Sequence, residues 1–316
     1  MRVVITGAAG FVGGHLVRAS LEAGHTVVGV DCFTPYYDPD AKRANVQPFL
    51  DDPAFSLVEA DLRTADLVPL LEGADVVYHQ AGQPGVRLSW SDGFADYVSL
   101  NVIATQRLLE AAKAARPGKV VYASSSSVYG NAATYPTSES ALPQPHSPYG
   151  VTKLAAEHLC GLYAANWGVP TISLRYFTVY GPGQRPDMGF RRFIDAVLDD
   201  RPVPLFGDGE QVRDFTYVSD VVAANLAAGV ADTAPGTVVN VAGGGSATVN
   251  SLLDLLGEIS GRPVEIDHQP EQPGDVRATG GSIEKAQALL GWAPVVPMRE
   301  GLAAQFAWQA ALPVGA

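Results

Sequence analysis

The sequence predicts an α/β protein whose core is a doubly wound parallel sheet. Short, continuously apolar segments, such as residues 2–6 and 75–79, alternate with segments of helical period. Such apolar segments are typical of strands that are buried on both faces of a parallel sheet, and their alternation with helices favours crossover connections. With 316 residues, of which 47% are hydrophobic, the chain can bury a large core in one domain or in two closely joined ones.

A glycine-rich turn follows the first predicted strand and opens the first predicted helix. Gly7, Gly10 and Gly13 allow a tight turn, close approach of a pyrophosphate to the backbone, and close packing of the helix. The next predicted strand, 25–30, is followed by Asp31, whose carboxylate suits the adenine ribose hydroxyls and repels the additional phosphate of NADP. We therefore predict that this end of the sheet binds NAD; the alternative is a purely structural glycine turn.

The third strand and its flanking segments are expected to complete the adenine end of the cofactor site. Residues 32–53 are rich in Pro, Tyr and Asp, and we predict a surface excursion with a short helix near 41–45. A strand at 55–59 follows, and Asp61 and Leu62 come after its carboxyl end, where an adenine would lie.

The fourth strand, 75–79, leads into a loop of small residues, 80–87, that is suited to pass closely over a cofactor. We interpret His79 as a packed strand residue and not as a catalytic one. The remaining elements are expected in chain order as follows: helix 92–115, strand 119–123, loop 131–147, helix 148–166, strand 169–176, helix 190–200, strands 202–209 and 214–218, helix 220–230, strand 237–241 returning to the main sheet, helix 249–259, strand 263–268 and helix 283–290.

A hydroxyl, a phenol and an ammonium group are predicted to meet where the fifth strand ends. Tyr149 and Lys153 stand four residues apart in a helical segment, so both project from one face of the helix. A lysine beside a phenol favours the phenolate and is expected to lower its pKa. The serine run that includes Ser125 can lie opposite. This set suits proton transfer, although Tyr-x-x-x-Lys by itself also describes an ordinary solvated helix face.

Composition argues against several other classes of protein. The net charge of −12 and the lack of clustered Lys and Arg disfavour binding to nucleic acid or to an anionic membrane. Cys32 and Cys160 form neither a disulfide framework nor a metal-ligand pattern, and we predict no metal site. The N-terminus lacks a signal-peptide pattern and no apolar segment is long enough to span a bilayer, so we expect a cytoplasmic protein.

On these residues the chain resembles an extended short-chain dehydrogenase/reductase, an NAD-dependent nucleotide-sugar epimerase. The resemblance covers nearly the whole length. It rests on the glycine turn, Asp31, the Ser125/Tyr149/Lys153 set and two further motifs, Leu174-Arg-Tyr-Phe177 and Arg213-Asp-Phe-Thr-Tyr-Val218. It implies a Rossmann-type domain of residues 1–176 and about 219–243, and a smaller mixed α/β substrate domain of residues 177–218 and 244–316.

The resemblance also implies roles for individual residues. Tyr149 would take a proton from the C4 hydroxyl of the sugar while hydride passes to NAD, Ser125 would bridge that hydroxyl, and Lys153 would hold the nicotinamide ribose. The implied cofactor-binding residues are Gly7, Gly10, Phe11, Val12, Gly13, Asp31, Asp61, Leu62, Gln80, Ala81, Gly82, Tyr149, Lys153 and Tyr176.

Within this family the chain is most similar to the UDP-glucuronate 4-epimerases, through the serine run, Phe177-Thr-Val-Tyr-Gly181, Arg185-Pro-Asp-Met188, Tyr36-Tyr-Asp38 and Gly85-Val-Arg87. Sugar 4,6-dehydratases have Asp-Glu where this chain has Ser126 and Ser127. Decarboxylases have Glu at position 127 and Asn at position 178, where this chain has Ser and Thr. Both of these reactions are therefore disfavoured.

A 4-keto uronate is a β-keto acid, so an epimerase has to hold its carboxylate out of line with the carbonyl. We expect Ser126, Ser127 and Thr178 to hold it, with Arg185 as a charged partner. Other substrate contacts implied by the resemblance are Arg213 and Arg277 for the diphosphate, Asp275 for the nucleotide ribose, Met188 and Arg192 near the uracil, and Arg87 for either substrate or protein.

Several alternatives stay open from the sequence alone. The same hydroxyls could line a pocket for a neutral hexose, as in a UDP-glucose or UDP-N-acetylglucosamine 4-epimerase. A UDP-glucuronate decarboxylase and a non-catalytic NAD-binding sensor are the other candidates, although the intact Ser125, Tyr149 and Lys153 argue against a sensor. The resemblance further implies a homodimer that pairs through the helices at 92–115 and 148–166.

Overall fold

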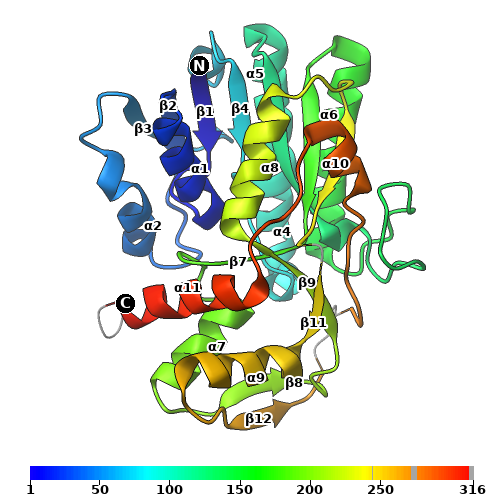
Figure 1. The fold of residues 1–316 in the computed structure, drawn as a ribbon. Helices are drawn as coiled ribbons and strands as arrows, with labels where there is room; N and C mark the ends of the chain where they lie inside the picture. The colour runs from blue at the N-terminus through cyan, green and yellow to red at the C-terminus, as the bar shows by residue number, and fades with distance from the viewer. Residues whose placement is uncertain (244, 272–275, 313–316) are drawn as a thin grey trace.

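The computed structural model describes residues 1–243, 245–271 and 276–312. It contains a large unit built on a seven-stranded sheet and a smaller unit beneath it (Figure 1). Every pair of neighbouring strands in the large sheet is parallel, and their order is β10-β6-β5-β4-β1-β2-β3. The strands are β1 (Arg2–Thr6), β2 (Thr26–Asp31), β3 (Phe55–Glu59), β4 (Val76–His79), β5 (Lys119–Ser125), β6 (Thr171–Tyr176) and β10 (Thr237–Val241). The predicted doubly wound parallel sheet is confirmed, and so is the return of 237–241 to it.

Helices cover both faces of this sheet because alternate strand residues point to opposite sides. Val3 and Ile5 of β1 pack in one core with α1 (Phe11–Glu22) and α8 (Val218–Val230), whereas Val4 packs in a second core with α5 (Ala104–Ala115) and α6 (Pro148–Trp167). Both faces are thus apolar, which explains the continuously apolar strands of the sequence.

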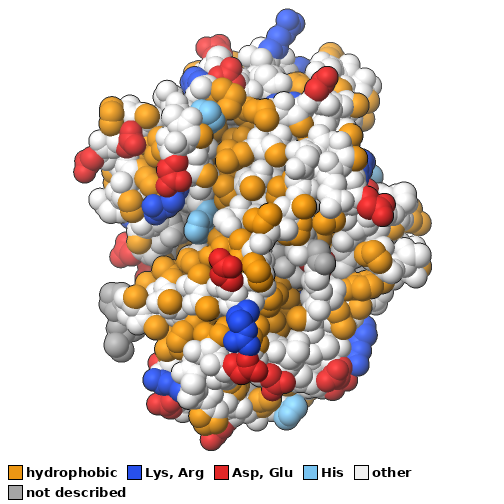
Figure 2. Space-filling view, in the orientation of Figure 1, with side chains coloured by type: hydrophobic (Ala, Val, Ile, Leu, Met, Phe, Trp, Pro, Cys, Tyr) orange, Lys and Arg blue, Asp and Glu red, His pale blue; other side chains and the backbone are white. Residues whose placement is uncertain are grey.

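The smaller unit carries its own core under a three-stranded and a two-stranded sheet. The three strands are β11 (Ser246–Thr248), β9 (Val212–Tyr217) and β7 (Thr178–Tyr180), and the two are β12 (Ile266–Gln269) and β8 (Val203–Phe206). Its helices are α7 (Gly189–Leu198), α9 (Val249–Ser260) and α11 (Met298–Ala310). Apolar side chains gather over α11 and the junction of the units, and Lys and Arg lie scattered among Asp and Glu on that face (Figure 2).

The structure differs from the sequence prediction mainly in short and irregular elements. The sequence patterns did not predict β7, β11, α11 or the single turn α3 (Val68–Leu71). The helix expected at 92–115 is a composite of α4 (Phe94–Tyr97), a π-helical segment, η4 (Val98–Ile103), and α5. The other helices are α2 (Pro39–Val46), α10 (Glu284–Leu290) and the 3-10 turns η1 (Gln47–Phe49), η2 (Arg87–Ser89), η3 (Ser91–Gly93) and η5 (Ser126–Val128). Within the described residues, no helix combines the length and apolarity needed to cross a membrane.

Candidate active site

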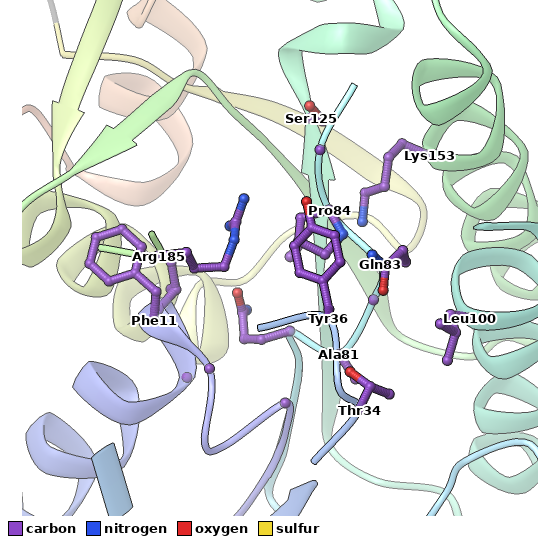
Figure 3. A pocket seen from close by; sticks show the side chains of 18 of the residues that line it. Phe11, Thr34, Tyr36, Ala81, Gln83, Pro84, Leu100, Ser125, Lys153 and Arg185 are labelled. Carbon is purple, nitrogen blue, oxygen red and sulfur yellow. The ribbon is translucent and has the colours of Figure 1, made fainter. Parts of the chain in front are cut away.

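A cavity of about 440 Å³ lies where the strands of the large sheet end and the smaller unit begins. Its lining includes all fourteen residues predicted to bind the cofactor, from Gly7 to Tyr176, together with Ser125. Seven of the predicted substrate residues line it: Ser125 and Tyr149, already named, and in addition Ser126, Ser127, Thr178, Arg185 and Met188. In Figure 3, Arg185 and Lys153 point into this cavity from opposite sides, with Tyr36 and Ser125 between them. That these residues bind NAD and a sugar stays a prediction at this point.

The glycine turn packs backbone against backbone too closely to admit a side chain. A Cβ on Gly13 would lie 1.9 Å from the Gly7 carbonyl oxygen, and a Cβ on Gly7 would lie 2.7 Å from the Ala81 nitrogen. Gly10 is the N-cap of α1 and no side chain caps this helix, so its first turn presents backbone N–H groups to the cavity. This arrangement fits a dinucleotide pyrophosphate.

Asp31 stands at the carboxyl end of β2 and is oriented by the backbone around it. Its two carboxylate oxygens accept hydrogen bonds from the N–H groups of Ala9 and Phe33, at 3.0 and 2.9 Å. Each carboxylate oxygen has a further lone pair that can accept from a ribose hydroxyl. Asp61 lines the same end of the cavity, where the guanidinium of Arg63 already binds its carboxylate at 2.6 Å.

Tyr149, Ser125 and Lys153 meet at the other end of the cavity. Ser147 caps α6 by accepting from the Gly150 N–H, which places Tyr149 in the first helical turn, and the ring of Tyr97 packs edge-on against it at 6.1 Å. The Ser125 hydroxyl faces the phenol of Tyr149 in the same cavity and acts to lower its pKa. The ammonium of Lys153 is buried and lies 4.5 Å from the centre of the Tyr122 ring.

Burial raises the pKa of Tyr149, and this corrects the expectation that Lys153 would lower it. The Ser125 hydroxyl and the positive charge of Arg185 oppose that rise without cancelling it. Burial also lowers the pKa of Lys153 to about 8, because an ammonium loses its hydration there. The cation that acts on the phenol in this structure is thus Arg185.

A buried ion pair supports the serine strand from behind. Glu157 accepts from Arg175 at 2.6 and 2.9 Å and from the Ser124 hydroxyl at 2.6 Å. Ser124 is therefore engaged in the protein interior, which supports Ser125 as the serine that works with Tyr149. His79 is a packed strand residue, as predicted, with Thr6 and Thr105 hydroxyls 2.7 and 2.9 Å from its ring nitrogens.

Arg185 is the guanidinium that faces the Tyr149 end of the cavity. It binds Asp187 through its Nε and Nη2 at 3.0 and 3.1 Å, and Asp187 also accepts from the Tyr36 hydroxyl at 3.1 Å. Desolvation raises the pKa of Tyr36 well above its ordinary value, so Tyr36 is a hydrogen-bond donor. A ligand carboxylate would find a preformed cation here, shared with one protein carboxylate.

The other predicted substrate arginines lie outside the described lining of the cavity. Arg87 and Arg192 approach the ring of Phe206 from two units of the protein, at 4.2 and 5.8 Å. Arg213 donates to the carbonyl oxygens of Val212 and Arg277, so the two predicted diphosphate ligands are neighbours. Arg277 is exposed and paired with Asp208 at 2.9 Å. Asp275 lies outside the described residues.

Some residues that shape the site were not predicted from the sequence. Lys42 lines the cavity with a mostly buried side chain and donates to Thr34 at 2.6 and 3.0 Å. Gln184, which precedes Arg185 in the chain, forms a buried hydrogen-bonded pair with Gln305. The spacing of Gly301, Gln305 and Gln309 along one helix face could have indicated α11, but no local signal links it to Arg185.

Comparison with known proteins places these residues in context. Residues 3–242 match the family described as the NAD dependent epimerase/dehydratase family. A relative from Bacillus subtilis named as an uncharacterized UDP-glucose epimerase is 41% identical and covers 99% of each chain. A probable UDP-glucuronate 4-epimerase of Rhizobium meliloti is 36% identical, over 98% of this chain and 96% of the relative. The crystal structure of the Bacillus cereus UDP-glucuronic acid 4-epimerase with UDP-glucuronic acid and NAD has a TM-score of 0.95 and 42% identity, covering 98% of this chain and 99% of that one.

Proposed function

We propose that this chain, which belongs to the NAD dependent epimerase/dehydratase family, interconverts UDP-glucuronate and UDP-galacturonate by inversion at C4 with NAD as cofactor. The observation that carries the proposal is the group formed by Arg185, Ser126, Ser127 and Thr178 on the lining of the cavity that also holds Tyr149. A guanidinium and three neutral hydroxyls suit a sugar carboxylate. The Bacillus cereus structure with UDP-glucuronic acid and NAD supports both ligands.

The chain's own residues supply the proton transfer. Tyr149 removes the proton from the C4 hydroxyl as a phenolate, which Arg185 and Ser125 favour against the effect of burial, and Ser125 keeps donor and acceptor in line. When bound, NAD supplies a reversible hydride acceptor for C4. The resulting 4-keto sugar turns its other face before the hydride returns, and Tyr149 then gives the proton back, so no net oxidation occurs.

The residues proposed to bind the sugar carboxylate determine whether the 4-keto uronate keeps that carboxylate while the ring rotates. Decarboxylation of a β-keto acid needs the bond to the carboxylate to align with the carbonyl π system. Arg185 and the hydroxyls of Ser126, Ser127 and Thr178 can hold the carboxylate while the ring rotates. Position 127 is a serine here and not a glutamate, so no negative side chain repels the sugar carboxylate. This favours epimerisation over decarboxylation.

The nucleotide end of the substrate is proposed to lie against the smaller unit. Arg213 and Arg277 are adjacent, as contacts to a diphosphate would be. Arg87, Arg192 and Phe206 form a second cluster of two guanidinium groups and one ring, next to which a uracil and its ribose can be placed. The packing of α8 and β10 with the large sheet supports the proposed assignment of residues 219–243 to the NAD-binding domain.

A UDP-glucose 4-epimerase is the second candidate, because the relative from Bacillus subtilis at 41% identity is named for that activity. Three hydroxyls can also accommodate a neutral hexose. The feature that disfavours this candidate is Arg185, whose charge would face an uncharged hydroxymethyl group. Comparing the two substrates separates the candidates.

We also propose that the protein is a cytoplasmic homodimer. Exposed apolar side chains follow the solvent side of α4, η4 and α6: Phe94, Ile103, Val151, Leu162 and Trp167. Pairing of these helices between two copies would cover that surface. Two free thiols, Cys32 and Cys160, are consistent with a reducing compartment.

The test is to incubate the purified protein with UDP-glucuronate and follow the sugar by proton NMR, with carbon dioxide measured in parallel. We expect UDP-galacturonate without any UDP-pentose, and a much lower rate with UDP-glucose. A UDP-pentose would show a decarboxylase instead. A higher rate with UDP-glucose would establish the second candidate. If neither sugar reduces the bound NAD, a non-catalytic NAD-binding protein would be favoured.

A further inference from the structure

The C-terminal helix α11 turns a stripe of polar and small residues toward the protein interior. Gly301, Gln305 and Gln309 recur every four residues on one face, and all three are buried. Gln305 is completely inaccessible to solvent, at 0% exposure. Glutamine is rarely found so deep, because its amide must find partners to offset the loss of water.

Gln305 finds those partners in the loop that carries Arg185. Its Oε1 accepts from the Gly181 N–H at 2.8 Å and its Nε2 donates to the Gln184 Oε1 at 2.8 Å. Gln184 is itself 2% exposed and donates to the Val179 carbonyl at 3.0 Å. A continuous hydrogen-bonded chain therefore runs from β7 through two glutamines back to the first residue of the loop.

This chain is joined directly to Arg185, because Arg185 follows Gln184 in the sequence. The loop from Gly181 to Met188 has no regular secondary structure, and Gly181 and Gly183 adopt φ values of 136° and 81° that favour glycine. Its backbone is therefore held by individual contacts. Besides the Gln305 contact, the Pro182 carbonyl lies 2.8 Å from the His15 ring nitrogen.

We infer that Gln305 is a positioning residue for carboxylate recognition: through Gln184 and Gly181 it fixes Arg185, and thereby sets the preference for a uronate over a neutral hexose. The inference rests on the proposed function. No residue of α11 is among the described residues that line the cavity, so Gln305 acts through the loop without touching the sugar.

A role limited to filling space would be served equally well by an apolar side chain, whereas only a polar one also satisfies the Gly181 N–H and the Gln184 amide. Methionine has nearly the same length and volume as glutamine, and would fill the position without needing polar partners. A satisfied buried amide network instead selects one arrangement of the groups it joins. The polar choice at position 305 is thus explained by the need to hold one conformation of the loop.

The experiment compares binding of UDP-glucuronate and UDP-glucose to the NAD-loaded protein by calorimetry, in a Tyr149→Phe background that blocks turnover. We expect Gln305→Met to reduce the preference for the uronate about tenfold. The matched control is Gln309→Met, which lies on the same face of α11 and is 4% exposed, but bonds to α7 and not to the loop. It should change the preference less than about twofold.

A double-mutant cycle decides whether the effect passes through Arg185. In an Arg185→Gln background, Gln305→Met should leave the preference unchanged, since the group that it positions is gone. An equal loss in both backgrounds, or a Gln305→Met protein that matches Gln309→Met, would overturn the inference. If the Gln305→Met protein does not fold, Gln184→Met is used in its place. It removes the loop's own member of the hydrogen-bonded chain, and its preference for the uronate is compared with that of Gln309→Met. A wild-type protein without any preference for the uronate would overturn the proposed function as well.

Discussion

The two sides of the cavity are held in place by different kinds of contact. The cofactor wall, formed by residues 7–13, Asp31 and 80–82, depends on strand and turn backbone: the Gly7 and Ala8 N–H groups donate to Val30 and the Ala9 N–H to Asp31. The substrate wall is formed by residues 126–127 and 178–188. Its loop depends on contacts with distant partners, which lie between 124 and 167 positions away in the sequence. In the cofactor wall the glycine turn follows from local sequence pattern, although Gln80 and Ala81 also bond to Asn225 and Thr6. The loop of the substrate wall depends on its distant partners, so substitutions far from the cavity can alter it.

Tyr149 stands between the two walls, and its loss should give the largest effect. Tyr149→Phe removes the proton acceptor while leaving the ring packed against Tyr97, so we expect turnover to fall by about 10³-fold. Both walls remain intact, so NAD content and UDP-sugar binding should be unchanged. Steady-state assays and measurement of bound NAD check this. Undiminished turnover would remove Tyr149 from the mechanism.

A substitution in the cofactor wall should weaken NAD binding regardless of the sugar. Gly13→Ala would place a methyl group 1.9 Å from the Gly7 carbonyl oxygen, which forces the turn to shift. We expect NAD affinity to fall by on the order of 10²-fold, as measured by titration. Gly161→Ala, in α6, is the control because no atom lies within 4 Å of its added Cβ. Retention of NAD by the Gly13 variant would contradict the proposed role of the turn.

A substitution in the substrate wall should instead change the choice of sugar. Arg185→Gln removes the cation that faces the carboxylate, so kcat/KM for UDP-glucuronate should fall by roughly ten- to a hundredfold. The value for UDP-glucose should hardly change, and bound NAD should be retained. Release of carbon dioxide is expected to rise, because the carboxylate is held less firmly. Equal losses for both sugars would show that Arg185 has a general structural role.

The smallest expected effect is on stability, at the junction of β9 with the large unit. Asp214 is buried, accepts from the Gly243 and Gly281 N–H groups, and its pKa is raised by desolvation to about 6. The folded state therefore binds more protons than the unfolded state between about pH 4 and pH 6, so this carboxyl's stabilising contribution falls as the pH rises through that window.

The Asp214→Asn variant has an amide in place of the titrating carboxyl, so it lacks this contribution to the pH dependence of stability. We expect the difference in the free energy of unfolding between wild type and variant to shrink by about 1–3 kcal/mol from about pH 4 to about pH 6. Urea unfolding at several pH values measures it. A difference that does not depend on pH would show that Asp214 is not protonated preferentially in the folded state.

Much of the cofactor wall could be predicted from the sequence because its determinants are local. Apolar strands, a glycine turn and an acid at the next strand end fix backbone geometry over a few residues, and every predicted cofactor residue lines the cavity. The spacing of Tyr149 and Lys153 likewise follows from the period of a helix. Their pKa values did not follow, because burial, which raises that of Tyr149, depends on how the whole site is enclosed.

The sequence by itself determined the fold class, the glycine turn and the set of groups that we propose transfer the proton. Only the tertiary structure decided that Arg185 shares the cavity with Tyr149 and pairs with Asp187, that Arg87 and Arg192 meet at Phe206, and that α11 supports the loop of Arg185. The reason is physical: periodicity reports the surroundings of neighbouring residues, whereas a hydrogen bond between Gly181 and Gln305, 124 positions apart, exists only after α11 has packed against the loop that follows β7.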